Sequence, residues 1–231
     1  MPTALEEMRI VARRLQPLNV NFTFIGGAVL GLLVDDVRLS QVRATKDVDV
    51  VVAVVTYAEF AALEARLRAE GFKHDTSEGA PVWRWIVDGC LVDIMPRDTT
   101  AWGFSSKWFD EVLAFYQVTD LGDNISARVV SPAVFIATKL EAFKDRGCGD
   151  YMMSRDLGDI ITLMDGRATI VEDITLALPT VRSFISDGFT FLLGQRDFQD
   201  YLPEHLPNLE GARQRLPLVR QRFEAVARLN S

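Results

Sequence analysis

The chain has 231 residues, of which 48% are hydrophobic and 25% are charged, and its net charge is −7. A chain of this length can bury one or two hydrophobic cores, and its composition is that of a globular protein rather than a disordered one. The negative charge disfavours electrostatic binding of nucleic acid over the whole surface, although it is compatible with a local basic groove.

Two cysteines, Cys90 and Cys148, are too few for a disulfide framework or a cysteine-ligated zinc site. The first sixteen residues have the pattern of an amphipathic helix and lack the continuous apolar stretch of a signal peptide. No later stretch is long enough to cross a bilayer as a helix. We therefore expect a soluble, cytoplasmic protein that makes no membrane contact and keeps its thiols reduced.

The first half of the chain alternates between helical and strand patterns. We expect a helix over 4–16, a strand over 21–26, a short helix over 28–34, a strand over 47–55 and a helix over 57–71. Residues 81–95 are expected to form two strands around an Asp88–Gly89 turn, because Asp-Gly between apolar segments is a strong hairpin signal. This half therefore predicts an α/β pattern with mixed strand directions.

The second half changes to helical patterns from Ser131 onward. Ser131 is an expected N-cap, Pro132 suits the first helical position and Gly147 ends that helix. Further helices are expected over 151–166, over 172–185, around Phe189 and from Glu210. The sequence thus predicts an α/β (α+β) protein in which a helical part follows a mixed sheet with flanking helices.

Two aspartates, Asp47 and Asp49, begin the strand expected over 47–55. Positions two apart in a strand share a face, so these carboxylates project side by side while Val48 points into the core. Adjacent carboxylates repel each other and are costly to bury unless a cation lies between them. An exposed edge or turn would also tolerate them, but the apolar residues that follow favour a central strand and a divalent metal.

A third aspartate, Asp93, lies in the strand that follows the predicted hairpin. If this strand pairs beside the strand of Asp47 and Asp49, three carboxylates share one face. Carboxylates without histidine or cysteine form the oxygen site that Mg²⁺ prefers, and two-metal nucleotidyl transfer uses such a site. Asp88 is a rival candidate that its turn explains without chemistry.

Gly26 and Gly27 lie at the junction between a predicted strand and a predicted helix. Glycines allow a phosphate to approach the backbone, and a helix that follows offers free N–H groups. A tight turn explains the pair equally well, and neither a G-x-G-x-x-G motif nor a P-loop is present.

Lys139 lies within the apolar helix expected after Ser131, and Asp156 lies in the next predicted helix, near Arg155 and Asp159. A lysine in an apolar helix can extend its ammonium to solvent. It can also bind phosphate as a point charge while an aspartate of the neighbouring helix holds it. The residues alone leave both explanations open.

A resemblance to the AbiEii/MenT-type nucleotidyltransferase toxins of bacterial toxin–antitoxin systems is carried by the segments FIGGAVLGLL, RATKDVDVVV, VDIMP, SPAVFIATKLEAFKDRG and SRDLGDIITLMDGR. The glycine pair, the D-x-D motif and the third strand aspartate also resemble the wider nucleotidyltransferase fold shared with DNA polymerase β. The resemblance covers residues 20–168. It implies a catalytic domain over 1–130 and a helical domain over 131–231 that completes the nucleotide site.

The resemblance implies that Asp47 and Asp49 hold Mg²⁺ and activate the incoming hydroxyl. Asp93 would be the third carboxylate, whose role is less uniform in this group.

The resemblance also implies residues that contact the NTP. Gly26, Gly27 and the Thr45 hydroxyl would meet the triphosphate, and Lys46 would neutralise it. Lys139 would bind phosphate, and Asp156 would orient that lysine.

The implied reaction transfers a nucleoside monophosphate from an NTP and releases pyrophosphate. Some members of the family modify the 3′ end of tRNA, and a cognate antitoxin is the implied partner. A small-molecule nucleotidyltransferase of the aminoglycoside type shares the same core and is an alternative, which an acidic acceptor cleft would favour over a basic groove. A non-catalytic nucleotide-binding or protein-interaction module is a third class, disfavoured by the intact set of Asp47, Asp49, Lys139 and Asp156.

Several other residues have one structural and one functional explanation. His74 and His205 are isolated in sequence and are expected to be packing or surface residues. Trp83, Trp85 and Trp102 could stack a nucleobase or fill the core. The C-terminal segment contains arginines that form either a basic patch or a solvated helix face: Arg213, Arg215, Arg220, Arg222 and Arg228.

Overall fold

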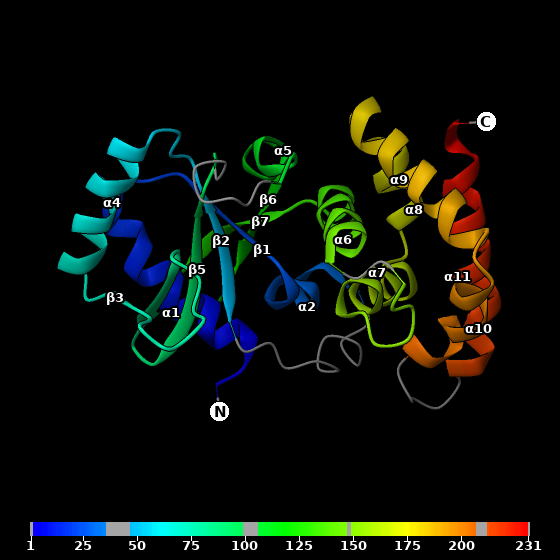
Figure 1. The fold of residues 1–231 in the computed structure, drawn as a ribbon, viewed down its shortest axis with the longest axis horizontal. Coiled ribbons are helices and arrows are strands. Elements are labelled where there is room, and N and C mark those ends of the chain that lie inside the picture. The colour runs from blue at the N-terminus through cyan, green and yellow to red at the C-terminus, as the bar shows by residue number, and fades with distance from the viewer. Residues whose placement is uncertain (1, 36–46, 99–105, 147–148, 207–211, 231) are drawn as a thin grey trace. The chain divides into compact units, whose positions relative to one another are not determined.

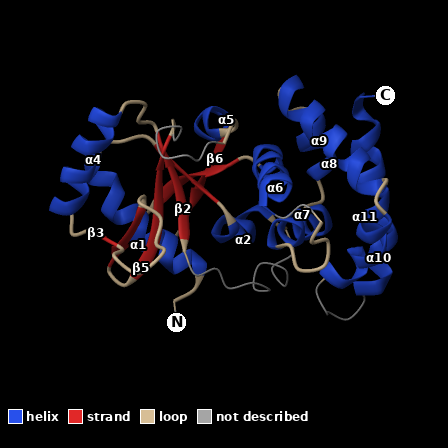
Figure 2. Ribbon diagram, viewed as in Figure 1, coloured by secondary structure: helices blue, strands red, loops and turns tan. Residues whose placement is uncertain are grey.

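The computed structural model describes residues 2–35, 47–98, 106–146, 149–206 and 212–230. The chain forms two compact units, of which one combines Met1–Val29 with Arg43–Ser131 and the other combines Leu30–Val42 with Pro132–Ser231. Figure 2 shows the strands in the first unit and only helices in the second. This combination of a mixed sheet with many helices confirms the predicted α/β class.

The first unit is built on a seven-stranded sheet with the order β3-β4-β5-β2-β1-β7-β6. The central strand β2 runs parallel to β5 and antiparallel to β1, and β1 runs parallel to β7. The strands are β1 (Phe22–Ile25), β2 (Val48–Val52), β3 (Lys73–His74), β4 (Arg84–Val87), β5 (Cys90–Pro96), β6 (Tyr116–Asp120) and β7 (Ser126–Val130) (Figure 1).

The predicted Asp88–Gly89 hairpin is confirmed between β4 and β5. Both turn residues have positive φ angles, 47° at Asp88 and 82° at Gly89, as a type I′ turn requires. The turn fixes the pairing of the two strands, so Val87 lies opposite Cys90 and Arg84 lies opposite Asp93.

Strand β2 lies in the middle of the sheet, and its valines form part of the core. Val48, Val50 and Val52 are fully buried, whereas Asp49 between them is half-buried. This alternation is the one that the sequence predicts, and it directs Asp49 to the opposite face from these valines.

Among the described residues of the first unit, the helices α1 (Ala4–Leu15), α4 (Tyr57–Ala69) and α5 (Phe109–Ala114) flank the sheet. Helix α1 contacts β2 and β5, and α5 contacts β1 and β2. Thr3 and Thr56 begin α1 and α4 with capping boxes, in which the threonine hydroxyl accepts from a backbone N–H and a glutamate three residues on accepts in return. The helices predicted over 4–16 and 57–71 are therefore confirmed.

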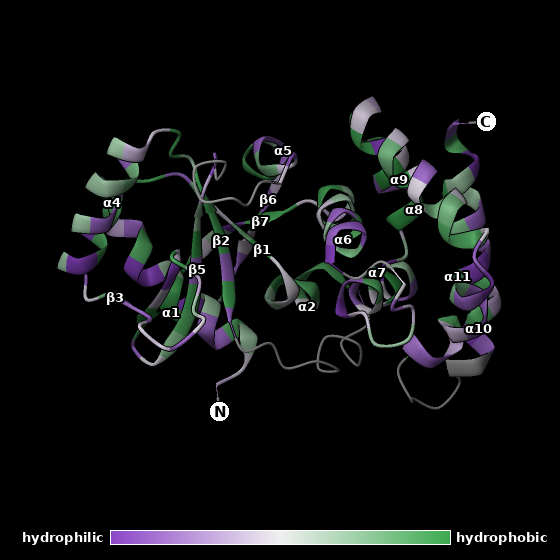
Figure 3. Cartoon of the chain, viewed as in Figure 1, coloured by the Kyte–Doolittle hydropathy of each residue, from purple (hydrophilic) through white to green (hydrophobic). Residues whose placement is uncertain are grey.

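The described residues of the second unit form the helices α2 (Leu30–Leu33), α6 (Pro132–Arg146), α7 (Arg155–Gly166), α8 (Ile170–Thr175), α9 (Pro179–Leu193), α10 (Arg196–His205) and α11 (Ala212–Ala227). Helix α6 packs against α7 and α9, and α9 packs against α11. Phe189, Phe198 and Phe223 are fully buried and stack among these helices, with ring centroids 4.4 and 5.4 Å apart around Phe223. Figure 3 shows that these helices contain both hydrophobic and hydrophilic residues, as expected for helices with one buried face.

The helix predicted over 172–185 is wrong as a single element. The chain instead ends α8 at Thr175 and begins α9 at Pro179, and Leu178 between them is not helical, with φ −49° and ψ 141°. Proline disfavours a helical conformation for the residue before it and suits the first helical position itself. Pro179 therefore separates two helices that periodicity alone joins.

The short helix predicted over 28–34 is split as well. It begins as a 3₁₀ turn over Gly27–Val29 and continues as α2, which belongs to the second unit. Two hydrogen bonds fix this segment, because the Arg167 side chain donates to the Leu33 carbonyl and the Ala168 backbone N–H donates to the Asp35 carboxylate. None of the described helices has the length and apolar character needed to cross a membrane.

Candidate active site

The carboxylates predicted to form a site meet on the central strands of the sheet. Asp49 on β2 lies directly beside Asp93 on the parallel strand β5, and Asp47 immediately precedes β2. Asp93 is nearly buried, with 7% of its surface exposed. The strand pairing on which the sequence argument depended is thus present in the structure.

A guanidinium lies between two of these carboxylates. Arg84 on β4 donates through Nε and Nη2 to both oxygens of Asp93, at 2.7 and 2.8 Å, and through Nη2 to Asp47 at 2.7 Å. These hydrogen bonds to Asp93, with the nearby charges of Asp47 and Asp49, raise the pKa of the Arg84 guanidinium above its usual value. Arg84 therefore stays charged and supplies a fixed positive charge at the site.

Sequence reasoning did not single out Arg84, although a signal was present. In a hairpin with a two-residue turn at Asp88–Gly89, the residues on either side pair outward one by one. This pairing places Arg84 opposite Asp93, as the structure has it. The contact with Asp47 carries no such local signal, because it depends on β2 lying beside β5.

Gly26 provides the space into which Asp49 projects. A Cβ atom built at Gly26 would lie 1.9 Å from Oδ2 of Asp49, and the φ angle of Gly26 is +73°. Both the contact and the backbone conformation require glycine at this position. The turn after β1 therefore leaves room for the Asp49 carboxylate. This role of Gly26 is more specific than the tight turn that explains the glycine pair in the sequence.

The oxygen donors of the site suit a hard divalent cation such as Mg²⁺. Within the described part of the chain, however, no three His, Cys, Asp or Glu side chains converge as a group that could hold a metal. Arg84 contacts both oxygens of Asp93 and one oxygen of Asp47, so an ion at these carboxylates would share Asp47 with the guanidinium. Thr45 and Lys46, which the resemblance links to the triphosphate, lie outside the described residues.

Glu7 on α1 adds a further acidic group near this site. Burial and the charge of Asp47 raise the pKa of the Glu7 carboxyl above its ordinary value. Glu7 therefore lies close enough to Asp47 for the two carboxylates to interact electrostatically.

The second unit contains the other predicted set. The Lys139 ammonium on α6 lies 2.7 Å from Asp159 and 3.3 Å from Asp156, and only 12% of the lysine side chain is exposed. Asp156 and Asp159 are three residues apart on α7, so they share one face of that helix. Asp156 thus contacts Lys139 as predicted, but Asp159 is its nearer partner.

A second cation supports Asp156. Arg146, at the end of α6, donates to both oxygens of Asp156 at 3.2 Å. Lys139 is therefore held deep in the helical unit, not extended to solvent as the snorkelling explanation required. The cluster holds α6 against α7 and fixes the position of the ammonium.

The C-terminal arginines divide between internal and surface positions. Arg222 donates to the carbonyls of Met164 and Asp165 at the end of α7, and Arg215 forms an ion pair with the buried Asp165 at 3.1 Å. Arg228 pairs with Glu224 on the surface. The basic patch considered for this segment is therefore reduced, since two of its arginines hold the end of a helix; the Arg213 side chain lies outside the described residues.

Three of the remaining candidates, His74, His205 and Trp85, contact neighbouring residues within their units, and Trp83 is half-buried. His74 stacks on the buried Trp85 with ring centroids 3.6 Å apart, and His205 hydrogen-bonds the Tyr151 carbonyl. Trp85 is therefore part of the core rather than a nucleobase platform. Trp102 and Cys148 lie outside the described residues.

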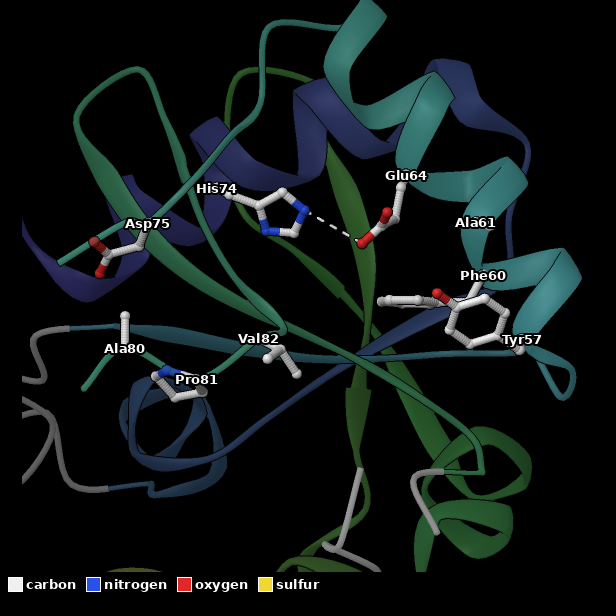
Figure 4. A pocket seen from close by; sticks show the side chains of 9 residues that line it. All are labelled: Tyr57, Phe60, Ala61, Glu64, His74, Asp75, Ala80, Pro81 and Val82. Carbon is white, nitrogen blue, oxygen red and sulfur yellow. Dashed lines mark ion pairs between the residues drawn. The ribbon is translucent and has the colours of Figure 1, made fainter. Parts of the chain in front are cut away.

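A cavity of about 420 Å³ lies in the first unit between α4 and the segment before β4. Figure 4 shows the Tyr57 and Phe60 rings on one side, with His74 and Glu64 forming an ion pair nearby. His74 shares a sheet face with Trp85, whereas the adjacent Arg84 points to the other face. The cavity is therefore separate from the carboxylates.

The fold is similar to that of an antigenic nucleotidyltransferase-like protein from Paracoccidioides brasiliensis. The crystal structure of that protein aligns with a TM-score of 0.52 and 19% identity over 96% of this chain and 92% of the other. The chain has a nucleotidyltransferase-like fold. A looser likeness, with a TM-score of 0.47 and 15% identity over 82% of this chain and 94% of the other, is to the antibiotic-resistance factor ANT(2'')-Ia. No protein-family model and no curated protein matches the sequence.

Proposed function

We propose that this chain is an Mg²⁺-dependent nucleotidyltransferase that moves a nucleoside monophosphate from an NTP to a hydroxyl of RNA. The observation that carries the proposal is the register of Asp49 beside Asp93 on neighbouring parallel strands, with Gly26 leaving room for the Asp49 carboxylate. Asp47 precedes Asp49 by two residues and so completes a pair on one face. The nucleotidyltransferase-like fold supports the same reading of these residues.

The proposed reaction is an in-line displacement at the α-phosphorus. The acceptor oxygen forms a bond to this phosphorus, and the bond from the phosphorus to the oxygen bridging the α- and β-phosphates breaks. Pyrophosphate leaves with the electron pair of the broken bond, and the hydroxyl proton passes to the Asp47–Asp49 pair. When bound there, Mg²⁺ would neutralise charge on the phosphate oxygens.

Lys139 is proposed to bind a phosphate of the nucleotide. Its ammonium is fixed by Asp156 and Asp159, which limits the number of positions it can take. A fixed cation loses little freedom when it binds, which favours stabilisation of charge that develops on the leaving group.

The acceptor in this proposal is the 3′ end of tRNA, and the chain acts in the cytoplasm as a toxin with a separate antitoxin protein. These points rest on the resemblance of the five sequence segments to the AbiEii/MenT-type toxins. The same resemblance implies that Thr45 and Lys46 would contact the triphosphate.

The test incubates the purified protein and Mg²⁺ with each α-labelled NTP in turn, with and without total tRNA. We expect label to enter tRNA with the wild-type protein and not with Asp49→Asn, which keeps the size of the side chain and removes its charge. Asp110→Asn is the matched control, because Asp110 pairs with Arg97 on the surface. Transfer to no acceptor with any of the four nucleotides would overturn the proposal.

A second candidate is transfer to a cationic small molecule of the aminoglycoside type. The inward positions of Arg215 and Arg222 favour it, because they leave fewer arginines on α11 for a polyanionic acceptor. The negative net charge of the chain points the same way. Replacing tRNA by a panel of aminoglycosides in the same assay separates the two, since label would then appear on the small molecule alone.

A further inference from the structure

Arg84 occupies the position of a cation among the carboxylates of the sheet. Its Nε and Nη2 atoms engage both oxygens of Asp93, and Nη2 also reaches Asp47. The Arg84 side chain is 22% exposed and the Asp93 side chain 9%, so water screens this ion pair little. A bidentate arginine–carboxylate pair of this kind is short and geometrically fixed.

This pairing changes what Asp93 can do. A carboxylate binds a metal through its oxygen lone pairs, and both oxygens of Asp93 already accept charged hydrogen bonds. A metal ion at Asp93 would have to displace the Arg84 guanidinium or lie beside it. In the second case the positive charges of the ion and of the guanidinium would repel each other. Asp47 is engaged through a single oxygen, Oδ2, in the contact with Arg84.

We propose that Arg84 takes the place of one of the two metal ions of a two-metal site. The chain then binds a single divalent cation at Asp47 and Asp49 together with the nucleotide, and Asp93 serves to anchor Arg84. The proposal rests on the proposed function, and it makes Arg84 a positioning residue for the carboxylates. If Arg84 served only to hold β4 against β5, replacing it would not change the number of metal ions bound.

The test counts Mn²⁺ bound to the full chain by equilibrium dialysis, with and without an α,β-methylene NTP analogue. We expect one ion per chain for the wild type in the presence of the analogue. We expect a second ion in Arg84→Met, because that substitution frees the oxygens of Asp93. Arg14→Met is the matched control, since Arg14 forms a bidentate pair with Asp88 at the hairpin turn, and it should leave the count at one.

A double variant keeps the test decisive if Arg84→Met does not fold. Arg84→Met combined with Asp93→Leu removes both charges, and replacing a buried ion pair by apolar residues is often neutral for stability. We expect this variant to bind one Mn²⁺, with affinity lowered by no more than about 100-fold, the range for a residue outside the ligand set. Loss of all metal binding in the folded double variant would overturn the proposal.

The outcomes also separate this proposal from the proposed function. Two ions in the wild type, or one ion in a folded Arg84→Met, would overturn the role of Arg84 while leaving nucleotidyl transfer intact. Absence of bound Mn²⁺ in every protein, with the analogue present, would overturn both the role of Arg84 and the metal dependence of the transfer.

Discussion

The two units each contain a charged cluster, and the clusters differ in which segments the cation connects. In the sheet, Arg84 contacts Asp47 and Asp93, with Asp49 beside them. In the helical unit, Lys139 and Arg146 contact Asp156 and Asp159. In the sheet one guanidinium bridges carboxylates of two neighbouring segments, whereas in the helical unit one ammonium lies between two carboxylates of the same helix.

This difference separates two uses of the same side chains. In the helical unit, a nearly buried ammonium between two carboxylates fastens α6 to α7. In the sheet, a guanidinium fixes the carboxylates of two separate segments relative to each other. Both clusters therefore fix the position of a cation, the first between two helices and the second among strands.

Replacing Lys139 tests the helical side of the comparison most strongly. Lys139→Met removes the ammonium that contacts the nearly buried Asp156 and Asp159, while Arg146 still contacts Asp156. We expect the free energy of unfolding to fall by about 3–5 kcal/mol, the usual cost of removing one partner of a buried ion pair. Urea denaturation followed by circular dichroism measures it.

Lys144→Met on the same helix is the control for this experiment. Lys144 lies over the Phe184 ring at 4.3 Å, and losing such a contact should cost about 1 kcal/mol or less. Equal losses for the two variants would mean that the helical cluster does not have the structural role assigned to it.

Replacing Gly26 tests the sheet side. Gly26→Ala adds a Cβ atom that meets Asp49 and places alanine at a positive φ angle, so we expect about 1–3 kcal/mol of destabilisation. Nucleotide transfer should fall as well, because Asp49 must move. Thermal unfolding and the labelled-nucleotide assay measure the two effects.

Gly71→Ala separates strain from the carboxylate contact. Gly71 also has a positive φ, +90°, but a Cβ there meets no atom within 4 Å. This variant should lose stability through backbone strain and retain transfer. If transfer in Gly26→Ala matches that in Gly71→Ala, the Gly26–Asp49 contact is irrelevant to activity.

The smallest expected effect concerns Glu7. Because its pKa is raised in the folded chain, the folded state holds the proton more tightly than the unfolded state does. The contribution of Glu7 to stability is therefore most favourable at low pH and declines as the pH rises through the raised pKa. Glu7→Gln should raise stability at pH 7 by less than about 1 kcal/mol, and the gain should shrink toward pH 4.

Melting temperatures of the wild type and Glu7→Gln across this pH range provide the measurement. A gain that grows as the pH falls would contradict the assigned sign and the proximity of Glu7 to Asp47.

Local spacing in the sequence was sufficient for much of this protein. Alternation along 47–55 determined which face Asp49 takes, and the Asp88–Gly89 turn determined the pairing of β4 with β5, because both depend on neighbours in the chain. The helix around Lys139 followed from its apolar pattern and its limits at Pro132 and Gly147. Strands β6 and β7 and helices α5 and α10 were not among the predicted elements.

Tertiary structure alone decided how the charges are shared. Arg84 meets Asp47 only because β5 pairs with β2, and Lys139 lies nearer to Asp159 than to Asp156 only because of how α6 and α7 pack. A period of two or of 3.6 residues determines the face of an element that a side chain occupies. It does not determine which distant element covers that face, because that choice depends on hydrogen bonds and packing between segments far apart in the chain.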